Sequence, residues 1–422
     1  MLVNPLVRSD CPRVGILILA SVAAALSARA QSPDADRLAP ATRAGLIEAE
    51  RQQKATQLEP DKPSGIEHAL NVIKEKRIVE RLTLGVVGFR AHMGGLITGS
   101  GFAVGPEYYR KDLWRDQMVL RASARASLQK FLLMDTELDL PRLADDHVFV
   151  NLYAVHRNYP HIDYYGPGPN SAKSGRTSWG LEDTSFQVRP GVQPVHGLRI
   201  GGIGRYLLVN VFPGHDDRFA QTDRVFTEAT TPGLRFQTDY VQGGGFIQYD
   251  WRDNPGGPRR GGNYIAQYST FEDIRRGGYA FSRVDLEAQQ YIPLFNQRRV
   301  IALRGRIEAT SPHTGDRVPF YLQPTLGGSE DLRGFRPFRF YDNNAVILNG
   351  EYRWEVFSGL DMALFADAGQ VFDDWHRINY RHLEADGGFG FRFNVRNDVF
   401  LRIDTAFSRE GFQVWVKFNN VF

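Results

Sequence analysis

The chain has 422 residues, with 51 lysines and arginines against 48 aspartates and glutamates, so its formal charge is only +3 with neutral histidines. This balance argues against a nucleic-acid partner, because nucleic-acid-binding proteins normally carry a strong or clustered basic excess. The one cysteine, Cys11, lies in a segment that we expect to be removed, which excludes a disulfide scaffold, a cysteine-based zinc site and a cysteine nucleophile.

Residues 1–30 have the pattern of a secretory signal peptide. Arg8 and Arg13 precede an apolar run over residues 14–26, and Ala28-Arg29-Ala30 follows it. We therefore expect cleavage after Ala30. The run is shorter than the roughly 20 residues that a membrane-spanning helix needs. No later apolar stretch reaches that length, so two classes remain: a soluble exported protein and a membrane β-barrel, whose alternating strands dilute the hydrophobic signal.

Residues 31–95 are expected to form a short periplasmic helical segment and linker. Residues 31–80 are rich in Ala, Glu, Gln, Lys and Pro and poor in aromatic side chains. Residues 41–58 and 66–82 could each form a helix, separated by Pro60 and Pro63. Two interpretations stay open: a partly ordered exported tail, and a helix that docks against the domain behind it.

From about residue 96 to residue 422 the sequence alternates with a period of two, which places successive side chains on opposite faces of a strand. In the last segment Phe412, Val414 and Val416 fall on one face, while Gln413 and Lys417 fall on the other. Such segments have one apolar and one polar face. Because the polar faces carry many charges of both signs, burial in a sandwich core would leave charges unpaired at several kcal/mol each.

The alternating segments number about sixteen, near 20 residues each with its connection, and bacterial outer-membrane barrels have even strand numbers. Short turns at 358–359 and 396–398 are interleaved with long loops at 160–180, 211–232 and 372–384. We therefore predict an all-β fold, a transmembrane antiparallel β-barrel of about 16 strands. The candidates for its outward aromatic girdle are Tyr108, Tyr109, Tyr164, Tyr165, Tyr321 and Phe422.

Two consecutive segments indicate how neighbouring strands should pair. Residues 118–127 place Arg121 and Arg125 on their polar face, and the next segment places Asp135 and Glu137 on its own. Opposite charges on adjacent strands favour pairing. The sequence therefore predicts a hairpin whose arginines and carboxylates face one another inside the barrel.

Two motifs about 30 residues apart carry a family resemblance. The segment Gly327-Gly328-Ser329-Glu330-Asp331-Leu332-Arg333-Gly334-Phe335 resembles the signature of the bacterial surface antigen family, the barrel superfamily that includes BamA, TamA and the two-partner secretion transporters. The segment Phe365-Ala366-Asp367-Ala368-Gly369 resembles the companion strand motif of that family. The C-terminal Phe422 resembles its barrel-assembly signal. The resemblance covers the chain from about residue 96 to its end.

The resemblance implies that Arg333, Gly334 and Phe335 lie at the tip of an extracellular loop that folds back into the lumen. Alternation places Phe365 and Asp367 on the inward face, so Asp367 can pair with the Arg333 guanidinium while the Phe365 ring provides a stacking surface.

Two glycines are consistent with a loop that packs closely against the inner wall and places Arg333 beside Asp367. Gly334 permits a tight backbone at the loop tip, and Gly369 lets the loop approach the wall. The alternative is that Arg333 is a solvated loop charge and Asp367 an ordinary lumen residue.

One feature departs from the family pattern. Relatives that assemble or secrete proteins carry polypeptide-transport-associated domains before the barrel, and residues 31–80 are too short for one. We therefore expect a form that lacks these domains.

The sequence offers no recognised catalytic or metal-binding pattern. It lacks a G-x-S-x-G elbow, a P-loop and an H-E-x-x-H motif. We expect no enzyme activity, no metal and no cofactor. The polar clusters that we interpret as solvated loop residues are His376, His382, Asp373, Asp374 and Glu384, and separately His215, Asp216 and Asp217. The arginine-rich stretch 256–262 is interpreted as a periplasmic turn.

Three functions are compatible with this chain. The resemblance implies a non-enzymatic barrel in the outer membrane of a Gram-negative bacterium that assembles or translocates polypeptide, or transports lipid, through a seam between its first and last strands. Its partners would be outer-membrane lipids and nascent outer-membrane or secreted polypeptides. The alternatives are a passive, constricted pore and, less favoured, an outer-membrane hydrolase.

Overall fold

The computed structural model describes residues 88–295, 297–378, 383–395 and 397–418. The expected signal peptide with its cleavage at Ala30, the helical segments before residue 83, His382 and the C-terminal Phe422 lie outside the described residues.

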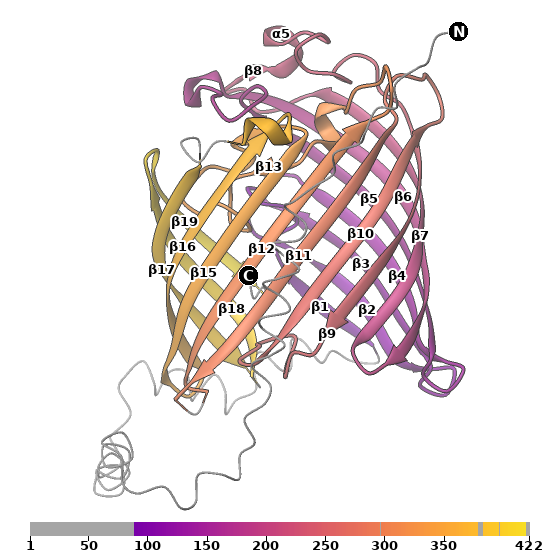
Figure 1. The fold of residues 1–422 in the computed structure, drawn as a ribbon, viewed down its shortest axis with the longest axis vertical. Coiled ribbons are helices and arrows are strands. Elements are labelled where there is room, and N and C mark those ends of the chain that lie inside the picture. The colour runs from indigo at the N-terminus through magenta and orange to yellow at the C-terminus, as the bar shows by residue number, and fades with distance from the viewer. Residues whose placement is uncertain (1–87, 296, 379–382, 396, 419–422) are drawn as a thin grey trace, which may run out of the picture. The chain divides into compact units, whose positions relative to one another are not determined.

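Sixteen antiparallel strands of the described chain form one sheet that curves into a nearly closed barrel (Figure 1), which confirms the predicted fold. The strands are β1 (Phe89–Gly94), β2 (Ala103–Leu113), β3 (Met118–Ser127), β4 (Leu132–Leu143), β5 (Val148–Tyr164), β6 (Thr177–Val195), β7 (Leu198–Pro213), β9 (Tyr240–Asp250), β10 (Gly261–Asp273), β11 (Phe281–Leu294), β12 (Arg299–Pro312), β15 (Asn344–Phe357), β16 (Leu360–Phe372), β17 (Glu384–Val395), β18 (Asp398–Ser408) and β19 (Gly411–Phe418).

Short elements cluster in the long loops at one end of the barrel, which we call the long-loop end; the opposite end is the short-turn end. None of the helices in the described ranges combines the length and the apolar character needed to cross a membrane. The short elements are β8 (Ala220–Gln221), α5 (Thr222–Val225), β13 (Thr325–Leu326), β14 (Phe340–Tyr341) and the 3₁₀ turns Lys173–Gly175, Phe320–Leu322 and Trp375–Arg377.

Each long strand pairs with the next in the chain, as the charge pattern predicts for β3 and β4. Arg121 lies opposite Glu137 in the ladder, and its guanidinium reaches Glu137 at 2.9 Å and Asp135 at 2.8 Å. The 251–260 connection lies at the short-turn end, where Asn254 donates to the Asn397 carbonyl at 3.0 Å. Its position agrees with the turn expected around residues 256–262.

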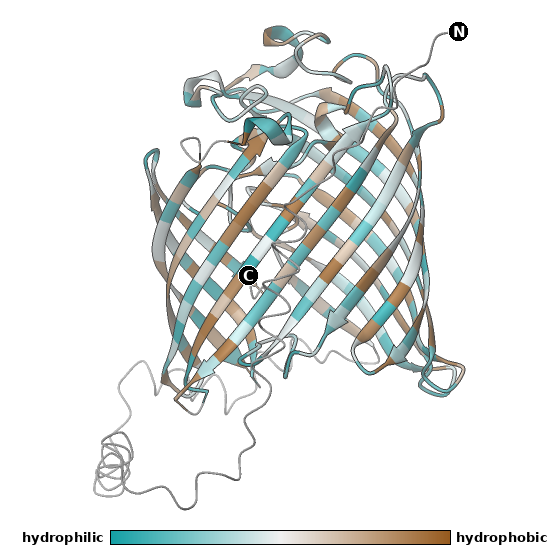
Figure 2. Cartoon of the chain, viewed as in Figure 1, coloured by the Kyte–Doolittle hydropathy of each residue, from teal (hydrophilic) through white to brown (hydrophobic). Residues whose placement is uncertain are grey.

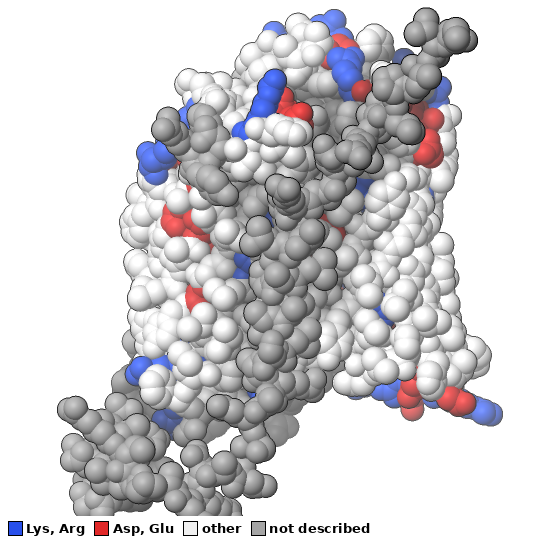
Figure 3. Space-filling model, viewed as in Figure 1, with Lys and Arg blue, Asp and Glu red and all other residues white. Residues whose placement is uncertain are grey.

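The side chains alternate between an apolar outer face and a polar lumen face. On β19, Phe412 is 64% exposed and Val416 57% exposed, whereas the inward Asp367 of β16 is 2% exposed. Figure 2 shows brown and teal positions alternating along the strands, and Figure 3 shows that much of the visible wall is uncharged. The outer face therefore suits an apolar surrounding, and the charges are turned into the barrel.

Two expectations from the sequence need correction. The first strand begins at Phe89, before the expected boundary at residue 96, because residues 89–94 pair with β2 despite their short length. Tyr164 and Tyr165 are 0% and 2% exposed and do not belong to an outward girdle. They lie at the end of β5 beneath the long loops, where the Tyr164 ring packs against Tyr341 at 4.9 Å between centroids.

The first and last strands form the edges of the barrel. Phe102, just before β2, packs edge-on against Phe418 at the end of β19, with ring centroids 5.5 Å apart. Among the described residues no pairing register joins β1 to β19, whereas each of them pairs with its neighbour in the chain. We call this junction the seam.

Candidate functional site

The loop between β12 and β15 folds into the barrel, and we call its residues 327–339 the plug loop. Its start requires glycine: Gly327 and Gly328 have φ angles of 114° and 108°, and a Cβ on Gly328 would collide with Thr98. Leu332 and Phe335 are then completely buried against the inner wall. The apolar cluster around them also contains Leu326, Phe340, Ala345, Ile347 and Val371.

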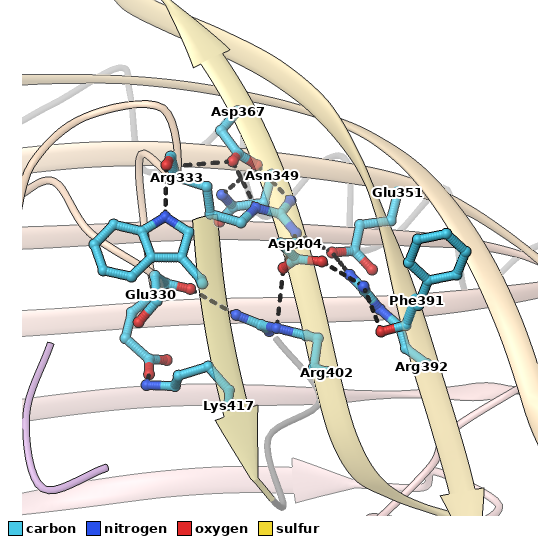
Figure 4. A network of polar contacts seen from close by, with 12 residues as sticks. Glu330, Arg333, Asn349, Glu351, Asp367, Phe391, Arg392, Arg402, Asp404 and Lys417 are labelled. Atoms are coloured by element: carbon cyan, nitrogen blue, oxygen red, sulfur yellow. Dashed lines mark hydrogen bonds and ion pairs between the residues drawn. The ribbon is translucent and has the colours of Figure 1, made fainter. Parts of the chain in front are cut away.

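Arg333, at the centre of the plug loop, binds Asp367 of β16 in a bidentate pair (Figure 4). Its Nε lies 2.7 Å from Asp367 Oδ2, and its Nη2 lies 2.8 Å from Oδ1. The guanidinium carbon Cζ lies 3.5 Å from the centroid of the Phe365 ring. The structure therefore brings Arg333, Asp367 and Phe365 together, with Asp367 and Phe365 on the face that alternation predicts and Arg333 in the position that the family resemblance implies.

Two more carboxylates share the Arg333 guanidinium. Its Nη1 donates to Glu351 of β15 and lies 3.4 Å from Asp404 Oδ2 of β18. Arg392 links these carboxylates, donating to Glu351 Oε1 at 2.9 Å and to Asp404. Arg402 lies 3.0 Å from Asp404, and Arg353 donates to Glu351 at 2.6 Å. We call this set the latch network.

The latch network is buried, so breaking one of its ion pairs should strongly lower the free energy of unfolding. Asp367, Glu351 and Asp404 have side chains that are fully buried, and the Arg333 side chain is 3% exposed. Burial alone lowers the pKa of Arg333, but Glu351 and Asp367 outweigh it and hold that pKa well above its ordinary value. Removal of one partner would leave buried charge uncompensated.

The plug loop is also held to both sides of the seam. On the first side, Thr98 of the β1–β2 connection hydrogen-bonds Ser329 at 3.1 Å. On the last strand, Trp415 Nε1 donates to the Arg333 carbonyl at 2.7 Å, and Lys417 pairs with Glu330. One loop therefore contacts the chain on each side of the junction between β1 and β19.

The glycines of the two motifs lie where a side chain would not fit. A Cβ on Gly334 would lie 2.6 Å from Asp386 Cβ and 2.8 Å from Ser408 Cβ. The Gly334 carbonyl accepts a hydrogen bond from Ser408 Oγ at 2.7 Å. A Cβ on Gly369 would lie 2.8 Å from Ile347 Cδ1. Both glycines permit the close approach of the loop to the wall.

Sequence reasoning missed most of the latch network. It identified Asp367 alone as the carboxylate of Arg333, and it left Asp404, Arg392 and Arg402 without a role. The alternation of their strands places these side chains inward but does not link them to Arg333. Gly390 is a further indication that a side chain from the neighbouring strand needs room there, because a Cβ on Gly390 would collide with the Asp404 carboxylate.

The described residues of the polar loop clusters bind partners within their own loops. Within the described ranges, no group of three or more His, Cys, Asp or Glu side chains is arranged to hold a metal ion. Asp374 accepts from the backbone and the ring of His376, each at 2.8 Å, and Asp216 binds Arg218 at 2.8 Å. These residues stabilise their own loops.

Comparison with known proteins finds a family domain in part of this chain and solved structures of similar fold. The profile of the Omp85 superfamily domain matches residues 202–407. BamA from Haemophilus ducreyi lacking POTRA domains 1-3 has a TM-score of 0.58 and 15% sequence identity, over 79% of this chain and 70% of that chain. CdiB from Escherichia coli has a TM-score of 0.54 and 11% identity, over 79% of this chain and 63% of that chain. No curated protein matches the sequence. At these identities the structural likeness shows a shared barrel fold.

Proposed function

Because the chain contains an Omp85 superfamily domain, we propose that it is an outer-membrane barrel that assembles or translocates polypeptides, or transports lipid, without catalysis. It would reside in the outer membrane of a Gram-negative bacterium, with outer-membrane lipids around it. Its short-turn end would face the periplasm and its long-loop end the outside, the usual orientation of such barrels.

The observation that carries this proposal is the plug loop fastened at the seam. Arg333 is held by carboxylates from β15, β16 and β18, while flanking residues reach the β1–β2 connection and β19. Release of this loop would free both edges of the barrel at once. The latch would thus keep the seam shut until a client competes for the edge strands, whose unpaired backbone groups favour strand addition.

The chemistry of the latch network supports a mechanical role. Arginine stays protonated in proteins and supplies no general base, and the carboxylates that surround Arg333 are engaged by guanidinium groups. We therefore assign to Arg333 and Asp367 the role of holding the loop, and to Gly334, Phe335, Phe365 and Gly369 that of fitting it to the wall.

The test is deletion of the gene, followed by quantification of the outer-membrane proteome and surface lipids against the parent strain. We expect a selective loss of certain barrels or secreted proteins, or a shift in lipid balance. Complementation with the wild-type gene should restore the envelope, and an Arg333→Ala variant should not. Arg218→Ala is the matched control, because Arg218 is an exposed loop arginine whose ion pair is with its neighbour Asp216, away from the plug loop.

A passive pore is the second candidate, favoured by the charged lumen face. Arg121, Asp135 and Glu137 form inward ion pairs on β3 and β4 that could set ion selectivity. An unchanged envelope after deletion, together with a conductance that depends on these charges, would replace the first proposal with this one.

A further inference from the structure

The inner wall of β5, β6, β7 and β9 carries two phenylalanines over a gap made by two glycines. Phe149 faces Gly191 in the ladder, Gly191 faces Gly201, and Gly201 faces Phe246. A Cβ on Gly191 would collide with the Phe149 ring, and one on Gly201 would lie 2.8 Å from Phe246 Cε1. The glycines thus let both rings lie across the wall, with centroids 6.2 Å apart.

Each ring carries an arginine. Arg189 Cζ lies 4.2 Å from the Phe246 centroid, and Arg199 Cζ lies 5.3 Å from the Phe149 centroid. We call these four residues the arginine–phenylalanine cluster. It lies near the β6–β7 turn, at the short-turn end.

The two arginines form no direct ion pair in the described part of the chain, although Asp139 and Asp250 attract Arg199 from beyond ion-pair distance. Within the described residues neither of them has an ion pair, and Arg189 Nε is buried without a hydrogen-bond partner. Arg199 Nε donates only to the neutral Gln193, at 3.3 Å. Asp250, a carboxylate near this wall, is occupied, because Arg252 binds it at 2.7 Å.

A guanidinium stacked on a ring directs its N–H groups outward in the plane, where they match the two oxygens of a carboxylate. The ring also fixes the orientation of the side chain before a ligand arrives. Since the rings lie 6.2 Å apart, their spacing is close to the roughly 6.7 Å between side chains on one face of an extended strand. Two acidic residues separated by one residue would therefore match the spacing of the two rings on which the guanidinium groups lie.

We propose that the arginine–phenylalanine cluster binds an acidic, extended polypeptide segment at the periplasmic mouth of the lumen. The inference rests on the proposed function, and it names the client chemistry: carboxylates at alternate positions.

Binding can be measured on the purified full-length protein in a non-ionic detergent, by fluorescence anisotropy of a labelled ten-residue peptide of alternating Glu and Ser. A peptide of alternating Lys and Ser and inorganic phosphate are the comparison probes. We expect the acidic peptide to bind, the basic peptide not to bind, and phosphate to bind far more weakly than the acidic peptide. Equal affinity for phosphate and the acidic peptide would assign the site to a small anion and overturn the proposal.

Matched variants distinguish binding at the arginine–phenylalanine cluster from attraction by positive charge elsewhere on the protein. Arg189→Gln combined with Arg199→Gln should weaken binding of the acidic peptide by about tenfold or more, because two charge-assisted contacts are lost. Arg115→Gln removes one positive charge, as each single variant of the cluster does, from an exposed turn at the same end and should leave the affinity unchanged. Equal effects of the double variant and Arg115→Gln would contradict the proposal.

A conservative variant tests the stacked geometry. Arg189→Lys keeps the charge but loses the planar fork, so we expect weaker binding than in the parent protein. Parent-like affinity in Arg189→Lys would show that charge alone suffices and would contradict the stacked site.

The failure of this site is distinguishable from the failure of the proposed function. If deletion removes clients from the envelope and the double variant restores them fully, the assembly function stands and the site is wrong. If deletion leaves the envelope unchanged, the proposed function is wrong.

Discussion

The two walls of the barrel treat their inward arginines in opposite ways. On β15–β18, Arg353, Arg392 and Arg402 are bound to carboxylates that also hold Arg333 of the plug loop. On β6 and β7, Arg189 and Arg199 lie on phenylalanine rings and form no ion pair with a carboxylate of the described residues. The arginines of β15–β18 are therefore paired within the protein, where they help to hold the plug loop. The arginines of β6 and β7 are available to bind a ligand.

This difference follows from what surrounds each arginine. A buried guanidinium requires a carboxylate, because an unpaired buried charge costs several kcal/mol, and the plug loop buries the latch network completely. Arg199 is exposed, so water and a stacked ring are sufficient. We therefore expect mutations on β15–β18 to affect mainly the stability of the protein and the release of the plug loop. Mutations on β6 and β7 should affect mainly the binding of the acidic peptide.

The largest effect is expected for Arg333→Ala. The substitution leaves Asp367, Glu351 and Asp404 with less positive charge in a buried site, so the free energy of unfolding should fall by about 3–5 kcal/mol. The plug loop should also loosen, which raises the conductance in planar bilayers. Arg218→Ala should change neither quantity, and a parent-like conductance and stability in Arg333→Ala would contradict the latch.

A smaller effect is expected for Gly390→Ala on the same wall. Its Cβ would collide with the Asp404 carboxylate, and the forced shift should lower the free energy of unfolding by up to about 3 kcal/mol. Gly243→Ala on β9 is the control, because nothing lies within 4 Å of the added Cβ. Thermal denaturation in detergent compares the two variants. Equal midpoints would show that β17 and β18 tolerate a shift of the Asp404 carboxylate and would contradict the prediction.

The smallest effect concerns Asp342, which follows β14 at the point where the β12–β15 connection meets the loop over residues 165–176. Gly168 N donates to the Tyr341 carbonyl there at 2.7 Å. Burial raises the pKa of the Asp342 carboxyl to about 6. The neutral form is therefore favoured by the fold, and its stabilisation is complete below pH about 4 and is lost as the pH rises through about 6.

Asp342→Asn should remove this dependence and stabilise the protein at pH 7.5 by about 2 kcal/mol or less. The thermal midpoint of the parent and the variant, measured between pH 4 and pH 8, tests the assignment. Curves that stay parallel across this range would show that Asp342 does not titrate there.

Sequence reasoning could predict the barrel and the central contact of the latch network, because both depend on local patterns. Alternation places Asp367 inward, and the family resemblance of the two motifs associates it with Arg333. It could not predict that Glu351 and Asp404 share Arg333, since this requires the register between distant strands.

The register between strands also determines which residues meet on the wall formed by β5, β6, β7 and β9. Phe149 and Phe246 come to lie over Gly191 and Gly201 only through the pairing of four strands, including an irregularity in the β6–β7 ladder after Val192. The position of Tyr164 was misjudged for a related reason. Alternation gives the face of a strand but does not indicate which loop folds over its end.

The central claim is that Arg333 and Asp367 act as one latch, and a double-mutant cycle tests it most directly. The free energy of unfolding is measured for the parent, Arg333→Ala, Asp367→Ala and the combined variant. A buried bidentate pair predicts strong non-additivity, with the combined variant little worse than the more damaging single variant. Additive effects with a coupling energy near zero would contradict the latch.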